Sequence, residues 1–173
     1  MEQLLLINPE QATSEEVATY KKRFAVRAVV TDAEDNVALL QVGKHGYYKL
    51  PGGGIEEEED RFVALERECM EEIGCHIEVY GEVGMIEEHR KMFELRQISY
   101  CYLARVVGSK GEPNFTESEL ANDFSIVWVH KNEVQSLLNT YMPTNKEGHD
   151  YIVPRDKCFL AAAVELISSQ KIN

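Results

Sequence analysis

The chain has 173 residues, of which 44% are hydrophobic and 28% are charged, and its formal net charge is −12. These values predict one globular domain over residues 1–173 with a core of its own. The longest apolar stretches are too short to cross a bilayer, so we expect no membrane partner. The excess of acids argues against a nucleic-acid polymer as partner. It does not exclude a small nucleotide, because a bound metal inverts the local charge of a site.

The opening stretch, MEQLLLINPEQATSEEV, has an acid at position 2 and a polar break after Ile7. It lacks the basic flank and the long apolar core of a signal peptide, so we expect a cytoplasmic protein. The four cysteines form no CxxC pair and are expected to stay reduced. The five histidines are scattered, which argues against a histidine metal site.

Hydrophobic patterning predicts the elements in chain order after a polar lead segment over residues 1–20. Strands are expected at 23–32, 37–43, 47–50, 76–90, 93–107 and 124–130, and helices at about 60–73, 131–141 and 155–170. The turn AEDN joins the first two strands into a hairpin, and Gly81 and Gly84 should kink the strand over 76–90. Residues 108–122 are predicted as a polar loop, and Asp156 as the N-cap of the last helix. Hairpin-like pairs with interleaved helices predict an α/β (α+β) fold with a mixed sheet between helices.

The stretch LPGGGIEEEEDRFVALERECMEEIGC, residues 50–75, combines three glycines with many acids. On a helix, Glu68, Glu71 and Glu72 fall within about 100° of each other, beside an apolar stripe. That stripe is formed by Phe62, Leu65, Cys69 and Ile73. A solvated acidic face is the plain alternative. Three features favour a bound cation instead: the acids adjoin the stripe, they lie in the C-terminal half of the helix, and a glycine loop precedes them. Carboxylates of this kind suit Mg²⁺ or Mn²⁺.

The same stretch matches the Nudix box, Gx5Ex7REUxEExGU with U a bulky apolar residue, over residues 53–75. The fixed positions are Gly53, Glu59, Arg67, Glu68, Glu71, Glu72 and Gly74. The chain therefore resembles the Nudix hydrolases. Both U positions, Cys69 and Cys75, are smaller than the usual residues, which affects the local packing rather than the chemistry.

The resemblance implies an α/β/α sandwich with a mixed β-sheet and covers residues 20–140. It also implies hydrolysis of a pyrophosphate bond in a nucleoside diphosphate linked to a group X, with Mg²⁺ or Mn²⁺ as cofactor. By the match, the carboxylates of Glu68, Glu71 and Glu72 and the carbonyl of Gly52 would bind the metal. Arg67 and Glu59 would form a supporting pair that holds the turn opened by Gly53. Many relatives are dimers, so a homodimer stays open, although no exposed stripe identifies its interface.

The general base stays open between two assignments. One is an acid of the stretch TESEL, where Glu119 is preferred to Glu117. The other is Glu71 or Glu72 acting also as base, and ordinary loop charge is the plain alternative for the TESEL acids. Arg27, Tyr47 and Lys49 lie before the box and could contact a phosphate or a nucleobase. Ordinary packing or surface charge is the alternative for these three residues.

Downstream markers of substrate are absent from the sequence. Positions 91–93, where some Nudix subfamilies carry a proline or a tyrosine, are Lys91, Met92 and Phe93. By elimination the expected substrate is a nucleoside triphosphate or a related nucleotide, as in MutT-like enzymes. The alternatives are an ADP-ribose or sugar-nucleotide pyrophosphatase and a nucleotide-binding module without turnover.

Overall fold

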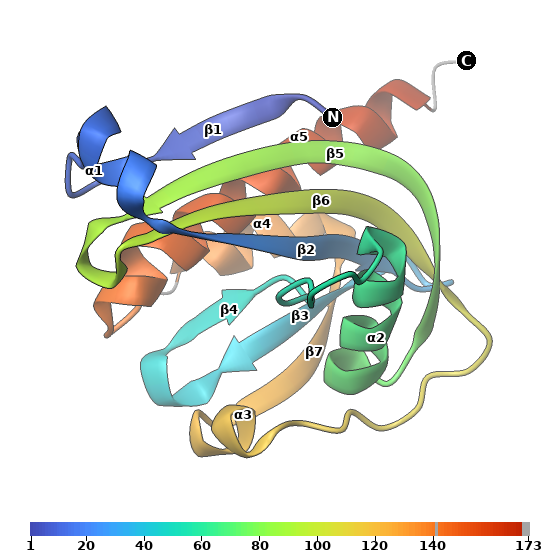
Figure 1. Cartoon of the computed structure of the whole chain (residues 1–173). Helices are drawn as coiled ribbons and strands as arrows, with labels where there is room; N and C mark the ends of the chain where they lie inside the picture. Colours follow the sequence, from blue (N-terminus) through green and yellow to red (C-terminus); the bar gives the residue numbers. More distant parts are fainter. Residues whose placement is uncertain (141, 171–173) are drawn as a thin grey trace.

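The computed structural model describes residues 1–140 and 142–170. A seven-stranded mixed sheet forms its centre, in the order β1-β5-β6-β2-β3-β4, with β7 paired to β3 (Figure 1). The strands are β1 (Gln3–Ile7), β2 (Lys21–Thr31), β3 (Asn36–Val42), β4 (Tyr47–Lys49), β5 (His76–Arg90), β6 (Leu95–Val107) and β7 (Phe124–His130).

Helices cover both faces of this sheet: α2 (Arg61–Ile73) on one face, and α4 (Lys131–Thr140) with α5 (Val153–Gln170) on the other (Figure 1). Strand β2 shows why, because alternate side chains of a strand point to opposite faces. Ala28 and Val30 belong to the core cluster that contains Leu65 of α2, whereas Val29 belongs to the cluster that contains Phe159 of α5. The predicted α/β/α sandwich with a mixed sheet is confirmed.

The sheet opens between β2 and β3. Strand β2 runs parallel to β6 over its whole length, but it pairs with β3 at a single position, Thr31 opposite Val37. Strand β3 pairs instead with β7 over its full length and with β4 at its end. The predicted hairpin over 23–43 is therefore paired only at its turn. Beyond that turn the two strands diverge, and this divergence makes room for the site described below.

Several predicted elements match the structure closely. Strand β5 is one long strand whose register against β6 shifts at Gly81 and Gly84, as expected from the two glycines. All four cysteines are free, as predicted. The helix predicted over 131–141 is α4, and its last residue, Tyr141, lies outside the described residues. In the described part of the chain, no helix is long and apolar enough to cross a membrane.

The lead segment predicted over residues 1–20 is wrong, because it contains two regular elements. Strand β1 joins the edge of the sheet parallel to β5, with Ile7 opposite Glu88. Helix α1 (Ser14–Thr19) begins at a capping box in which the Thr13 side chain accepts from the Glu16 amide and the Glu16 carboxylate accepts from the Thr13 amide. The run LLLI is short and does not alternate, so its pairing with a distant strand had no local signal.

The prediction for the last helix is also corrected. Helix α5 begins at Val153, directly after the π-helical turn Gly148–Ile152, so its first turn continues an existing helix and needs no side-chain cap. Asp156 is not an N-cap but a fully buried residue of that first turn. Its carboxylate accepts hydrogen bonds from the Leu50 amide at 2.8 Å and from Arg155 Nε at 2.7 Å. Likewise, the loop predicted over 108–122 contains the short helix α3 (Glu117–Ala121).

Candidate active site

The glycine turn and helix α2 form a rigid connection beside β2. The amides of Val26 and Ala28 donate to the carbonyls of Gly53 and Pro51, at 2.9 and 3.1 Å. Gly52 has a φ of +125°, and a Cβ at this position would overlap the carbonyl oxygen of Val26. Only glycine permits this close approach of two backbones without strain. The glycine turn is therefore held against β2 by main-chain hydrogen bonds.

Helix α2 has the boundaries that its sequence predicts. The Asp60 carboxylate accepts a hydrogen bond from the Phe62 amide at 2.8 Å, and Gly74 ends the helix with a φ of +64°. Leu65 and Ile73 are buried in the core, as expected for the apolar stripe. Phe62 is a correction: it is 51% exposed, and its ring lies 5.2 Å from the ring of Tyr102 on β6, centroid to centroid.

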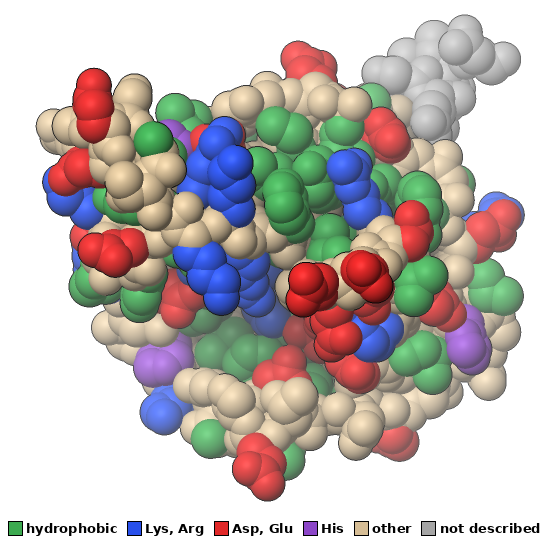
Figure 2. Space-filling view, in the orientation of Figure 1, with side chains coloured by type: hydrophobic (Ala, Val, Ile, Leu, Met, Phe, Trp, Pro, Cys, Tyr) green, Lys and Arg blue, Asp and Glu red, His purple; other side chains and the backbone are tan. Residues whose placement is uncertain are grey.

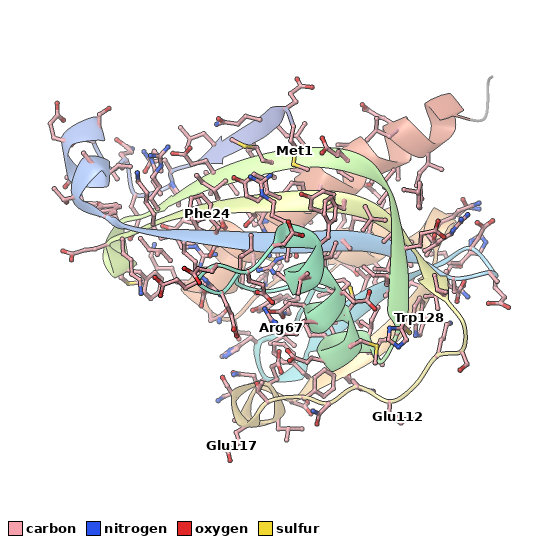
Figure 3. All side chains as sticks on the ribbon, turned by 45° about the vertical axis from the view of Figure 1, so that its right-hand side comes forward. Met1, Phe24, Arg67, Glu112, Glu117 and Trp128 are labelled. Carbon is pink, nitrogen blue, oxygen red and sulfur yellow. The ribbon has the colours of Figure 1, made fainter. Side chains whose placement is uncertain are left out.

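Arg67 joins the carboxylates of this segment into one network (labelled in Figure 3). Its Nε and Nη2 each donate to a Glu59 oxygen at 2.9 Å, and Nη2 also donates to the carbonyl of Gly54 at 3.1 Å. Its Nη1 donates to Glu68 at 2.9 Å and lies 3.5 Å from Glu71. The Arg67 guanidinium holds the pKa of Glu59 below its usual value. The expected contact between Arg67 and Glu59 is therefore present.

Glu72 lies deepest of the box acids and is only 2% exposed. Its carboxylate accepts hydrogen bonds from Lys49 Nζ at 2.8 Å and from the Gly52 amide at 2.5 Å. Burial raises the pKa of Glu72, because loss of hydration outweighs the attraction of Lys49. Lys49, which the sequence suggested as a substrate contact, thus lies beside a proposed metal ligand.

The donor atoms fit a hard divalent cation by chemistry and by location. Glu68, Glu71, Glu72 and Gly52 all line one cavity and offer only oxygen ligands. A Cβ at Gly53 would overlap the Glu68 carboxylate, so the glycine leaves the room that this side chain occupies. In the described residues no three such side chains converge into a metal cage. The reason is visible in the contacts: Glu68 and Glu71 turn to Arg67, and Glu72 turns to Lys49.

The cavity has a volume of about 690 Å³ and two walls of opposite charge. The acids of the glycine turn and α2 form one wall. The other wall carries four guanidinium groups, which belong to Arg23, Arg27, Arg90 and Arg155. Figure 2 shows basic side chains gathered next to the acidic cluster around a hollow in the surface. Such a site can bind an anion on one wall and a cation on the other.

The two acids considered as general base have different positions. Glu119 lines the cavity, but its carboxylate caps α3 by accepting from the amide and the hydroxyl of Thr116, both at 2.8 Å. Glu117, in the first turn of the same helix, does not line the cavity and points away from it (labelled in Figure 3). The structure therefore brings Glu119 and not Glu117 to the site.

The remaining substrate-contact candidates both line the cavity. Tyr47 is buried, and burial raises its pKa to about 12. Arg27 is buried as well, on strand β2. Sequence reasoning missed three basic residues, Arg23, Arg90 and Arg155, as members of the site. No motif marks them, because they come from three distant segments that only the folded chain brings together.

Comparisons with known proteins identify the family. The family model of the NUDIX domain matches residues 21–154, well over half of the chain. The human diphosphoinositol polyphosphate phosphohydrolase NUDT4B is 27% identical over 104 residues, which are 60% of this chain and 56% of the human protein. The matched region thus spans little more than half of that relative.

Two solved structures share the fold at low sequence identity. A NUDIX hydrolase from Nitrosomonas europaea aligns with a TM-score of 0.62 and 15% identity, covering 84% of this chain and 90% of that one. An ADP-ribose pyrophosphatase from Streptococcus suis aligns with a TM-score of 0.52 and 18% identity, covering 82% and 91%. With its box intact, its sandwich fold and a family match over most of its length, the chain belongs to the Nudix family of hydrolases.

Proposed function

We propose that the chain hydrolyses a pyrophosphate bond in a nucleoside diphosphate linked to X, with a nucleoside triphosphate or a related nucleotide as substrate. The observation that carries this proposal is the two-sided cavity, in which the box carboxylates face a wall of guanidinium groups. Carboxylates alone would repel a diphosphate, and guanidinium groups alone could not hold a cation beside it. We also propose that the protein lies in the cytoplasm, where it would meet its nucleotide substrate.

The residues have separate tasks in this reaction. Glu68, Glu71 and Glu72 and the carbonyl of Gly52 would hold Mg²⁺ or Mn²⁺. When bound, the cation neutralises charge on the diphosphate and favours attack by water at phosphorus. Arg67, paired with Glu59, holds the glycine turn against α2 and orients Glu68 and Glu71, whereas Lys49 and the Gly52 amide hold Glu72. The Lys49 ammonium donates to the buried Glu72 carboxylate and opposes the rise in its pKa that burial causes.

Two assignments of the general base are proposed for testing. Glu119 lines the cavity on a short helix, and both hydrogen bonds from Thr116 go to its Oε2, which leaves Oε1 to accept a proton. Glu71 has a side chain that is 40% exposed and only a 3.5 Å contact to Arg67, so its carboxylate is also accessible to a water molecule. Glu72 acting as base is the other possibility within the box. A Glu119→Gln variant that keeps its turnover number and pH profile would assign the base to the box.

A second group of substrates has a specific observation in its favour. The wall of four guanidinium groups would suit a substrate with more phosphates than the diphosphate that is cut. The name of the human relative points to such a phosphate-rich substrate for that protein. ADP-ribose and sugar nucleotides remain in the test as the third group.

The proposal is tested by product release across a panel of nucleoside triphosphates, ADP-ribose, sugar nucleotides and a diphosphoinositol polyphosphate, each with Mg²⁺, Mn²⁺ or EDTA. We expect one class to be hydrolysed and EDTA to abolish the activity. The melting temperature should rise with Mg²⁺, since a ligand that binds only the folded state stabilises it. If no substrate of the panel is hydrolysed while Mg²⁺ still raises the melting temperature, the chain would be a nucleotide-binding module rather than an enzyme.

A further inference from the structure

The basic wall of the cavity comes from three parts of the chain. Arg23 and Arg27 lie on β2, Arg90 is the last residue of β5, and Arg155 lies in the first turn of α5. Three of the four are buried, with exposed fractions of 6% for Arg27, 3% for Arg90 and 1% for Arg155. Buried guanidinium groups are rare unless they are paired, so the partners of each one are informative.

Arg90 and Arg155 are held by carboxylates. Arg90 donates to Glu88 at 3.1 Å and to Glu147 at 2.6 Å. Arg155 donates to Asp156 at 2.7 Å and lies 3.8 Å from Glu88. These contacts fix the two side chains, yet Nε of Arg90 and Nη2 of Arg155 have no hydrogen-bond partner among the described residues.

Arg27 has no ion pair with any described residue. Its Nη1 donates to the Val26 carbonyl at 2.8 Å, and its Nε has no partner among the described residues. Desolvation, with repulsion from Arg155, lowers the pKa of Arg27 to about 10. The neighbouring Arg23 is more exposed but likewise has no ion pair with a described residue: its Nη1 donates to the neutral Gln97 at 3.2 Å, and desolvation and repulsion by Arg90 lower its pKa.

These two arginines flank the glycine turn. A Cβ at Gly52 would lie 3.0 Å from the Cα of Arg27, and a Cβ at Gly54 would lie 3.2 Å from Nη2 of Arg23. Neither arginine forms an ion pair with a described residue; carboxylates act on them only from a longer distance, Glu72 and Asp156 on Arg27 and Glu68 and Glu147 on Arg23. A buried cation without a direct partner, as Arg27 is, destabilises a fold unless a ligand supplies the opposite charge. A guanidinium group binds a phosphate through two parallel hydrogen bonds, which matches this requirement.

We propose that Arg23 and Arg27, backed by Arg90 and Arg155, bind an anionic group that the substrate carries in addition to the bond that is cut, namely a phosphate of X. This proposal rests on the proposed function and deepens it. The basic wall would then favour substrates whose X group carries a phosphate over substrates whose X group is neutral, such as a hexose. Arg27 is the central residue, because it is buried and has no carboxylate partner in the described structure.

The first test is anion binding without turnover. Inorganic tripolyphosphate is titrated by calorimetry into the protein in EDTA, where the acidic wall has no metal to attract the probe. We expect one binding site in the wild type and an affinity lower by about tenfold or more in Arg27→Gln and in Arg23→Gln. Arg105→Gln is the matched control, because Arg105 is an exposed arginine of β6 that pairs with Glu78 outside the cavity.

The second test is kinetic and uses two substrates with the same base. Guanosine triphosphate carries a phosphate on the diphosphate that is cut, and a guanosine diphosphate hexose carries a neutral sugar there. We expect the wild type to prefer the triphosphate, and Arg27→Gln to reduce this preference in kcat/KM by about tenfold, mainly through KM. Arg105→Gln should keep the wild-type preference.

The outcomes separate this inference from the proposed function. Equal tripolyphosphate affinity in the wild type, Arg27→Gln and Arg23→Gln would overturn the inference, even if the enzyme is active. Binding that depends on Arg27 without turnover of any substrate would support the anion site and reject the proposed hydrolysis. If Arg27→Gln does not fold, as judged by its melting curve, Arg23→Gln decides by the same criterion, since Arg23 is exposed and its change spares the core.

Discussion

Arg67 is the side chain on which the order of the acidic segment depends. It satisfies both oxygens of Glu59, one oxygen of Glu68 and the carbonyl of Gly54. No other arginine or lysine of the described residues forms an ion pair with Glu59 or Glu68. The position of Arg67 in the box therefore has a structural reason that precedes any chemistry: it keeps several acids close together without repulsion.

The substitution Arg67→Ala should lower both stability and activity. It removes four hydrogen bonds to charged or carbonyl oxygens, so we expect a loss of about 2–3 kcal/mol in the free energy of unfolding. Urea denaturation and turnover of the best panel substrate measure the two effects. Lost activity with unchanged stability would instead mean that Arg67 contacts the substrate.

The substitution Glu71→Gln should separate catalysis from folding. Its carboxylate is partly exposed and has one long contact to Arg67, so the melting temperature should change little. Turnover should fall on the order of 10²- to 10³-fold, as when a preorganised transition-state contact is removed. Glu57→Gln is the control, since Glu57 is an exposed acid of the same segment that does not line the cavity. Near-normal turnover in Glu71→Gln would show that the metal site is misassigned.

The turn between β4 and α2 is the part of the fold that places the chemistry. Main-chain hydrogen bonds hold it against β2 on one side, and the Asp60 cap starts the helix on the other. A helix with defined ends presents its side chains at fixed angles, so the carboxylates depend on this turn for their position. Backbone geometry, rather than side-chain contacts, limits which substitutions the turn tolerates.

The pair of substitutions Gly52→Ala and Gly108→Ala tests this limit. Both glycines have a positive φ, +125° and +75°, but a Cβ at Gly52 would overlap the Val26 carbonyl whereas at Gly108 it would meet nothing. We expect Gly52→Ala to cost roughly 2–4 kcal/mol and to abolish activity, because the turn must leave β2. Gly108→Ala should cost about 1–2 kcal/mol and keep activity. Equal effects in the two variants, measured by urea denaturation and turnover, would contradict the close approach.

Helix α5 contributes to the site although it packs on the face of the sheet opposite α2. Asp156, in the first turn of α5, accepts from the Leu50 amide just before the glycine turn and from Arg155 in the basic wall. The buried Asp156 carboxylate thus connects helix α5 to the residue before the glycine turn and to Arg155 of the basic wall. The helix packs against the opposite face of the sheet, yet it helps to shape the site.

The substitution Asp156→Ala should destabilise the whole fold by about 3–5 kcal/mol, because it leaves Arg155 buried with less compensation. Asp156→Asn should cost less, since its side-chain oxygen still accepts from the Leu50 amide. Lys157→Ala, on the same helix turn at a half-buried position outside the core cluster of Phe159, is the control for helix propensity. The free energy of unfolding from urea titration gives all three values, and an equal loss for Ala and Asn would make the charge of Asp156 the only important property.

Local patterns in the chain were enough for helix α2, its two ends and the spacing of its acids. They depend on periodicity and on capping residues within a few positions, and the box at 53–75 lies inside that range. The same reasoning placed β5, β6 and β7 within a few residues. It failed for β1 and α3, which are short, and for Asp156, whose partner Leu50 lies 106 positions away in the chain.

The basic wall depends entirely on the folded arrangement. Arg23 and Arg27 reach it from β2, Arg90 from the end of β5 and Arg155 from α5, and no local pattern links these positions. A charge on a strand has the same sequence signal whether it meets water, a carboxylate or an open cavity. The chemistry of the acidic wall could therefore be predicted from neighbouring residues. The basic wall, which would select the substrate, forms only in the folded chain, where β2 diverges from β3 and α5 packs against the sheet. Long-range packing alone decides which of these side chains meet.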